Sequence, residues 1–186
     1  SSDVCSSDLY TLIFASVLAL VALGGCFSEH SGVINIGLEG IMVMGALGGA
    51  LAMKFVPAGV PAIVMFLLVV LASLLMGVLF SLLLGVAAIN FNADQTLVGT
   101  ALNLMGTAAA VVIVRAINVA ENPDNVSSTI VYRKAKQVFL VNIGDFEFNW
   151  FMLIVVLVLI AAHIVLYKTR FGLRLCACGE HPQAAD

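Results

Sequence analysis

Four polar side chains recur within one apolar stretch of the sequence, at Thr96, Thr100, Asn103 and Thr107. Spacings of four, three and four residues place them on one face of a helix. An asparagine amide within a membrane is costly unless it forms a hydrogen bond or faces water. The pattern therefore predicts either an interhelical hydrogen bond across a close contact at Gly99 and Gly106, or one wall of a water-filled path.

Glu39 is the second unusual residue. It follows Asn35 in the glycine-rich stretch Ser31-Gly-Val-Ile-Asn-Ile-Gly-Leu-Glu-Gly-Ile-Met42. Such glycines permit a broken or re-entrant start to the next span, which is tolerated at membrane depth only against protein or a water-filled cavity. We expect Glu39 either to cap freed backbone amides or pair with His30, or to line such a cavity with Asn35 and contact a substrate there.

Cys176, Cys178 and His181 are residue types that bind zinc, and they lie close together in the sequence. A tetrahedral site needs a fourth ligand, which the sequence does not supply, so we expect reduced thiols and no metal. The sequence also has no Gly-x-x-x-x-Gly-Lys loop, and no Ser/His/Asp set or carboxylate pair suited to catalysis. We therefore expect this chain to bind no cofactor and to catalyse no reaction itself.

The composition indicates the class of protein. Of 186 residues, 62% are hydrophobic and only 10% are charged, and the mean hydropathy is +1.12. Soluble domains carry about 25% charged residues. Several apolar runs approach or exceed the roughly 20 residues that cross about 30 Å of hydrocarbon. The sequence predicts an all-α, polytopic transmembrane helical bundle.

Five hydrophobic segments are expected to span the membrane, at residues 10–27, 33–55, 60–89, 96–117 and 150–167. The third would be about 45 Å long at about 1.5 Å per residue, so it should tilt or emerge from the bilayer. In this third segment a small residue recurs at every fourth position, at Ser73, Gly77, Ser81 and Gly85. Gly45 and Gly49 offer a shorter version in the second segment, and such faces let helices approach closely.

Residues 118–149 form the one long polar connection between these spans. Apolar residues alternate from Phe139 to Phe148 around the turn-forming residues 142–145, which suits a short hairpin or an irregular loop equally well. Lys and Arg side chains occur both here and in residues 168–186, two segments that flank one span and must lie on opposite sides. Charge alone therefore does not orient the chain.

Both ends of the sequence look unlike those of a natural protein. Residues 1–9, Ser-Ser-Asp-Val-Cys-Ser-Ser-Asp-Leu, resemble the translation of a sequencing-library adapter. They lack the basic region of a signal peptide, and we expect them to contribute nothing to the fold. At the other end the chain stops at Asp186 within what looks like an unfinished motif, so we expect residues 10–186 to be a partial transmembrane domain.

Several blocks of the sequence resemble the ABC-importer permeases that serve nucleosides and simple sugars. Residues 31–46, Ser-Gly-Val-Ile-Asn-Ile-Gly-Leu-Glu-Gly-Ile-Met-Val-Met-Gly-Ala, are similar to their signature. Residues 93–104, Ala-Asp-Gln-Thr-Leu-Val-Gly-Thr-Ala-Leu-Asn-Leu, are similar to their next block. Residues 169–175, Thr-Arg-Phe-Gly-Leu-Arg-Leu, and 179–186, Gly-Glu-His-Pro-Gln-Ala-Ala-Asp, are similar to their ATPase-coupling loop.

Within this family, which also includes branched-chain amino acid and ribose-type permeases, the resemblance is closest to nucleoside permeases that work with basic-membrane-protein-type receptors. Ribose-type relatives usually have Ile-Asp-Leu-Ser where this chain has Ile34-Asn35-Ile36-Gly37. The chain departs from the family at Cys176 and Cys178, where an arginine and an aliphatic residue are usual. We therefore expect no role for a basic residue at position 176, whereas the loop as a whole still resembles that of the family.

The resemblance implies an orientation and a coupling site. It places residues 168–186 in the cytoplasm and residues 118–149 outside, in a bacterial plasma (inner) membrane. It assigns contact with an ATPase to Gly172, Arg174, Gly179, Glu180, Pro182, Ala184 and Ala185. We expect residues 172–186 to form a turn and then a short surface helix, with Pro182 in its first turn and Glu180 near its start, where a negative charge suits the helix dipole.

The implied function is ATP-driven import of nucleosides, or alternatively of simple sugars. The candidate path residues are Asn35, Glu39, Thr96, Thr100, Asn103 and Thr107. ATP would be hydrolysed on a separate ABC ATPase subunit, and the other partners would be a second permease subunit, an extracytoplasmic substrate-binding lipoprotein and membrane lipid, with no nucleic acid. A secondary carrier or channel is a further alternative, but it calls for carboxylates near the midplane, and only Glu39 and Asp94 come near.

Overall fold

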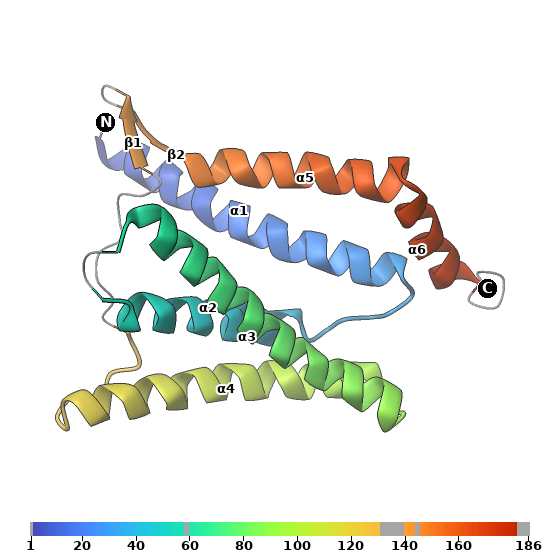
Figure 1. Ribbon diagram of the computed structural model, residues 1–186, viewed down its shortest axis with the longest axis horizontal. Coiled ribbons are helices and arrows are strands. Elements are labelled where there is room, and N and C mark those ends of the chain that lie inside the picture. Colours follow the sequence, from blue (N-terminus) through green and yellow to red (C-terminus); the bar gives the residue numbers. More distant parts are fainter. Residues whose placement is uncertain (1, 58–59, 131–139, 144–145, 182–186) are drawn as a thin grey trace. The chain divides into compact units, whose positions relative to one another are not determined.

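The computed structural model describes residues 2–57, 60–130, 140–143 and 146–181, with the backbone alone for residues 2–9, 62, 140–143 and 146–150. The elements are α1 (Ser2–His30), α2 (Leu38–Phe55), α3 (Ala62–Asn90), α4 (Gln95–Glu121), β1 (Leu140–Ile143), β2 (Phe146–Asn149), α5 (Trp150–Lys168) and α6 (Arg170–Glu180) (Figure 1). Helices α1 to α5 are long and apolar enough to cross a membrane. The predicted polytopic helical bundle with five spans is confirmed.

The helices form two compact units. The first contains residues 1–35 and 136–186, and therefore α1, the hairpin, α5 and α6. The second contains residues 36–135, and therefore α2, α3 and α4. This division was not visible in the sequence, because it joins helices that are far apart along the chain.

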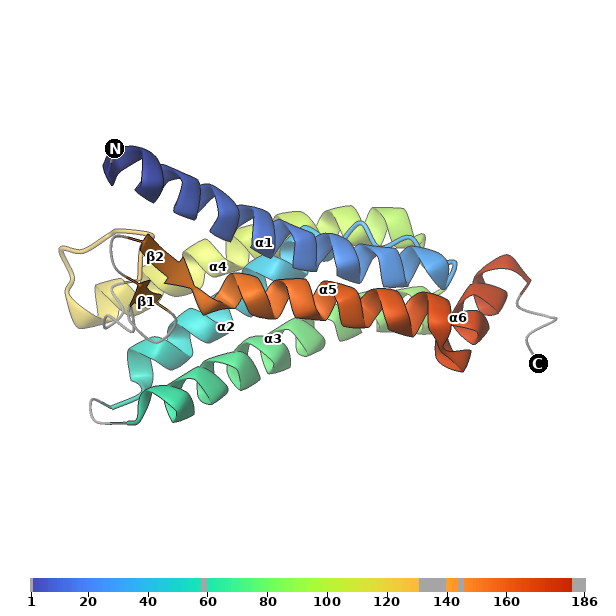
Figure 2. The same ribbon diagram turned by 90° about the horizontal axis from the view of Figure 1, so that it is seen from above.

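In the first unit, α1 and α5 lie side by side and run in the same direction (Figure 1, Figure 2). The ring of His30, at the end of α1, meets the ring of Tyr167 near the end of α5, with 6.3 Å between their centroids. Parallel spans require that the chain between them cross the membrane an odd number of times. Three full spans by α2, α3 and α4 meet this requirement.

Helix α1 extends to His30, three residues beyond the predicted end of the first span at residue 27. It ends in a Schellman motif. The Val33 N–H donates to the Ser28 carbonyl at 3.2 Å, and the Gly32 N–H donates to the Glu29 carbonyl at 2.9 Å. Gly32 has a φ of +79°, a left-handed conformation that favours glycine.

The backbone of residues 2–9 belongs to α1. These residues are therefore helical rather than irregular. Their side chains lie outside the described part of the structure, so the expectation that they make no packing contacts stays a prediction.

In the second unit, α2 packs against both α3 and α4. A Cβ atom at Gly48 would lie 2.8 Å from the Ala72 carbonyl oxygen, and one at Gly45 would lie 3.4 Å from the Ser73 carbonyl oxygen. The small residues thus bring α2 and α3 into close contact, as the sequence predicts. At Gly85, at the far end of the α3 face, a Cβ atom would meet nothing within 4 Å among the described residues.

The hydrophobic core of this unit is formed by one pair of buried side chains from each helix: Met44, Leu47, Phe80, Leu84, Leu102 and Val114. Most other large side chains of α3 are exposed and apolar. Such a surface suits a helix whose solvent is lipid, since lipid tails are as apolar as leucine.

Helix α4 extends to Glu121, so the polar connection begins at Asn122 and not at residue 118 as predicted. Asn118 is only 3% exposed, and its amide donates to the carbonyls of Ser127 and Thr129, each at 2.9 Å. Asn118 is therefore part of α4 and not of the connection, and its side chain fastens the returning chain to this helix. In the connection, β1 and β2 pair antiparallel with Val141 opposite Phe148, which confirms the hairpin alternative over the described strands.

Replacing Asn118 with leucine should release residues 126–130 from α4. The change leaves two carbonyls without their donor, at a cost of about 1–3 kcal/mol for each one that stays buried. We expect amide hydrogen exchange at residues 126–130 to become at least tenfold faster. Asn122→Ala is the control, since its side chain accepts only one weak bond, from the Asp124 N–H at 3.3 Å, and exchange should change little.

Candidate functional site

The start of α2 is capped by a side chain from another helix. Asn103 of α4 accepts a hydrogen bond from the Gly40 N–H at 2.7 Å and donates one to the Ile36 carbonyl at 2.8 Å. The N-cap residue itself, Gly37, has no side chain that could accept a bond from the first helical turn. Asn103 therefore supplies a cap that the local sequence lacks.

Close backbone contact makes this cap possible. A Cβ atom at Gly40 would lie 2.6 Å from the Leu102 carbonyl oxygen, and one at Gly106 would lie 2.9 Å from the Gly40 Cα atom. A Cβ atom at Gly99 would lie 3.0 Å from the Gly37 backbone nitrogen. The predicted close approach at Gly99 and Gly106 is confirmed, and of the two interpretations of Asn103 the structure shows the interhelical hydrogen bond.

Glu39 lies exposed in the first turn of α2, and among the described residues no hydrogen bond from it to a freed backbone amide is seen. The Gly40 N–H is held by Asn103 instead. A pairing of Glu39 with His30 would join the two units and stays a prediction. Asn35 is half-buried, and its Oδ1 atom is buried without a hydrogen-bond partner among the described residues.

The three candidate threonines of α4 are exposed on the surface of the second unit. The Thr100 hydroxyl donates to the Leu97 carbonyl at 2.9 Å, and the Thr107 hydroxyl donates to the Asn103 carbonyl at 3.0 Å. Bonds of this kind to the preceding turn satisfy a hydroxyl in lipid as well as in water. The roles of Thr96, Thr100 and Thr107 in a path therefore stay predictions.

Helix α6 docks on the end of α5 through Thr169 and Gly172. The Thr169 hydroxyl donates to the Val165 carbonyl and accepts from the Gly172 N–H at 3.4 Å, so one side chain joins the two helices. A Cβ atom at position 172 would overlap the Leu166 carbonyl oxygen. Only glycine allows α6 to fold back so tightly at this corner.

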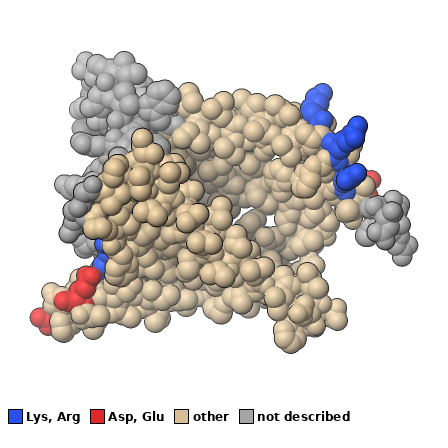
Figure 3. Space-filling view, viewed as in Figure 1, with Lys and Arg blue, Asp and Glu red and all other residues tan. Residues whose placement is uncertain are grey.

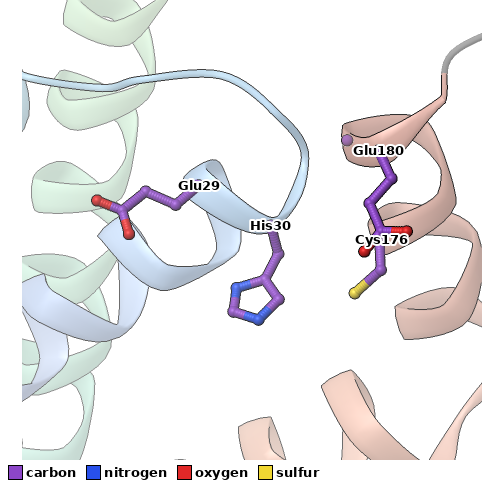
Figure 4. Close-up of a pocket in the computed structure, with 5 residues that line it drawn as sticks. Glu29, His30, Cys176 and Glu180 are labelled. Atoms are coloured by element: carbon purple, nitrogen blue, oxygen red, sulfur yellow. The ribbon is translucent and has the colours of Figure 1, made fainter.

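The other end of α6 docks on the end of α1. A Cβ atom at Gly179 would collide with the His30 carbonyl oxygen and lie 3.0 Å from the Gly32 nitrogen. Beside this contact is a cavity of about 330 Å³, lined by Glu29, His30, Cys176, Gly179 and Glu180. The His30 ring and the Cys176 thiol reach toward it from the two helices, whereas Glu29 points away (Figure 4).

The turn predicted from Gly172 is wrong in the described residues, where α6 extends over Arg170–Glu180. The Thr169 cap and the close packing of Gly172 and Gly179 account for this helix. The helix predicted with Pro182 in its first turn, and the benefit that Glu180 would gain from its dipole, depend on residues outside the described part of the chain and stay predictions. Pro182, Ala184 and Ala185 lie outside the described residues.

Gly172 and Gly179 pack against their own unit and so help to position α6, and their predicted contact with an ATPase stays a prediction. Arg174 lies on the outward side with Arg170, and together with Lys168 these exposed cations gather at the end of α5 and along α6 (Figure 3). Cys176 is half-buried on the inner side and Cys178 is exposed, so the two thiols do not converge. Among the described residues, no group of three or more His, Cys, Asp or Glu side chains could hold a metal.

The structure brings out residues that the sequence analysis missed. Asn118 fastens the returning chain to α4, and Arg115 is a charged residue inside α4. The charge of Arg115 in an otherwise apolar run was visible in the sequence.

Comparison with known proteins shows the family. The family described as "Branched-chain amino acid transport system / permease component" matches residues 8–186. A guanosine ABC transporter permease protein, NupQ of Bacillus subtilis, is 39% identical over 180 residues, which cover 95% of this chain and 56% of that protein. The nucleoside ABC transporter permease protein NupC of Lactococcus lactis is 38% identical, over 94% of this chain and 56% of that protein.

A more distant relative is a putative glucose ABC transporter permease protein, TsgC13 of Haloferax volcanii, which is 28% identical over 95% of this chain and 52% of that protein. No solved structure matches the chain with statistical significance. The chain thus spans about half the length of the curated relatives it matches. It is a multi-pass membrane protein, and it belongs to the family of branched-chain amino acid transport system permease components.

Proposed function

We propose that this chain forms part of the translocation path of an ATP-driven nucleoside importer. The observation that carries the proposal is its similarity to two nucleoside permeases, at 39% and 38% identity over nearly the whole chain. The fold supports it, because the glycine-rich start of α2 is non-helical up to Gly37 and is held there by Asn103. Irregular backbone of this kind is suited to a cavity at membrane depth.

The relatives named above are ABC transporter permease proteins, and residues 1–186 contain no Gly-x-x-x-x-Gly-Lys loop. We infer that a separate ABC ATPase hydrolyses ATP and docks at α6 and the residues that follow it. Arg174 would contact this subunit from the outward side of α6, and Pro182, Ala184 and Ala185 would extend the contact. A second permease subunit and an external substrate-binding lipoprotein complete the proposed complex, in a bacterial plasma membrane.

Within the path, we assign direct substrate contact to Asn35, Glu39 and the exposed threonines of α4. The buried, unpartnered Oδ1 atom of Asn35 supports this assignment, because a buried polar atom without a partner is costly until something binds it. Asn103 would instead fix the geometry of the path wall, since both ends of its amide are engaged.

The proposal is tested by uptake in cells that lack their own nucleoside importers. The full-length permease would be expressed with an ABC ATPase and a receptor from the same organism, and uptake of labelled guanosine, adenosine and glucose measured. We expect nucleoside uptake that is abolished when the P-loop lysine of the ATPase is replaced. Uptake that survives this replacement and collapses with a proton ionophore would instead indicate a secondary carrier.

A simple-sugar permease is the second candidate, favoured by the similarity to the putative glucose permease at 28% identity. The same assay separates the two candidates. Uptake of glucose without uptake of either nucleoside would overturn the proposed substrate class and leave the assignment as an ABC permease intact.

A further inference from the structure

Arg115 is a basic residue within a membrane span. Its side chain has no ion-pair or hydrogen-bond partner in the described part of the chain. Helices α2, α3 and α4 carry two basic residues, Lys54 and Arg115. Lys54 pairs with Glu121 at 2.9 Å, and its side chain is only 9% exposed. Arg115 is exposed and makes no ion pair or hydrogen bond with any described residue. Of the two acids at this end of the unit, Glu121 pairs with Lys54, and Asp124 forms no ion pair with Arg115 among the described residues.

The depth of Arg115 makes this exposure unusual. It precedes Glu121 by six residues and so lies about 9 Å inside the end of α4, at about 1.5 Å per residue. A charged side chain at such a depth usually faces a water-filled cavity or another polar group, unless it reaches the membrane surface along its own stem.

The exposed surface of α4 has two different sides. Thr100, Thr107 and Arg115 fall within about 80° of one another around the helix, at about 100° per residue, with Leu104 and Val111 between them. The adjoining exposed side carries no polar side chain and consists of Ala101, Met105, Ala108, Val112, Ala116 and Val119. A fully apolar side suits lipid, and a largely apolar side with a few polar groups is typical of a ligand path.

We propose that Arg115 is a specificity-determining residue in the outer part of the path and binds the base of a 6-oxopurine nucleoside, such as guanosine, through its O6 and N7 atoms. This inference rests on the proposed function. A guanidinium group offers only donors, in a planar fork, and is therefore best matched by two acceptors side by side. Guanine presents such a pair on one edge, whereas adenine presents one acceptor and one donor there.

The test uses the full-length permease with its ATPase and receptor, and measures uptake of guanosine and adenosine separately. The receptor is the same in every variant, so a change in the ratio of the two uptakes arises in the permease. Arg115→Gln should lower the guanosine-to-adenosine ratio by about tenfold or more, because a glutamine amide matches the adenine N6 and N7 atoms. Met105→Leu is the matched control on the apolar side of α4, to which no substrate contact is assigned, and should leave the ratio unchanged.

Arg115→Lys keeps the charge and the ability to reach the membrane surface, which protects the test against a variant that fails to assemble. Lysine lacks the planar fork, so guanosine uptake should fall about fivefold or more while adenosine uptake is retained. Unchanged guanosine uptake in Arg115→Lys, or an unchanged ratio in an assembled Arg115→Gln complex, would overturn the proposal. A wild-type complex that imports glucose and no nucleoside would overturn the proposed function as well.

Discussion

Replacing Asn103 with leucine is expected to loosen the start of α2 and to reduce uptake together with stability. The variant removes both hydrogen bonds that Asn103 makes, to the Gly40 N–H and the Ile36 carbonyl. A buried polar group left without a partner costs about 1–3 kcal/mol, and hydrogen bonds between membrane helices contribute at most about 1.7 kcal/mol. We therefore expect a loss of about 2–4 kcal/mol in the free energy of unfolding in detergent.

Thr107→Val is the matched control for this prediction. In the described part of the chain, the Thr107 hydroxyl bonds only to carbonyls of its own helix, at Asn103 and Leu104, so its loss should cost less than about 0.5 kcal/mol. If Asn103→Leu unfolded like the wild type and still lost uptake, Asn103 would act in the path rather than as a cap. Normal stability and normal uptake together would contradict both interpretations.

The membrane spans were predictable from the sequence because their signal is local. A run of apolar residues long enough to cross hydrocarbon has few alternatives to a helix, since every backbone group must be satisfied within the segment. The ends of α2 and α5, at Phe55 and near Tyr167, follow directly from the loss of apolar residues. The contact of α2 with α3 was predictable for a related reason, because Gly45 and Ser73 belong to small-residue faces that have no other evident purpose.

The cap on α2 could not be predicted from local sequence. Asn103 and Gly40 are 63 residues apart, and the sequence showed only that an asparagine in a span needs a partner. Glu39 lies in the first turn of α2, so its position made it a candidate to cap the backbone amides there. Tertiary packing decided otherwise, because the glycines at the contact bring the backbone of α2 within reach of the Asn103 amide.

Helix α6 was not predicted over residues 170–180, for a physical reason as well. Two glycines in eleven residues, Gly172 and Gly179, argue against a helix by intrinsic propensity and favour the turn that we expected. Both are required by contacts with α5 and α1 that only the fold reveals. The Thr169 hydroxyl supplies the observed cap.

Gly172→Ala is expected to displace α6 and to reduce ATP-driven uptake by at least tenfold in the assembled complex, while membrane insertion stays normal. The added methyl group would overlap the Leu166 carbonyl oxygen and lie 2.6 Å from the Val165 carbonyl oxygen. Both atoms are backbone, so no side-chain rotation relieves the overlap, and overpacking alone costs about 1–3 kcal/mol. On the proposed function, a displaced α6 presents Arg174 wrongly to the ATPase.

Cys176 reports the displacement directly, because it is half-buried on the inner side of α6. In a background where Cys176 is the only cysteine, its reaction with a maleimide should become several-fold faster in Gly172→Ala. Gly179→Ala should have the same effect, since its methyl group would meet the His30 carbonyl. Gly85→Ala is the matched control: its methyl group would meet no described atom within 4 Å, so uptake and thiol reactivity should stay at wild-type levels. A Gly172→Ala variant with wild-type uptake and wild-type reactivity of Cys176 would show that α6 does not depend on this contact for its position.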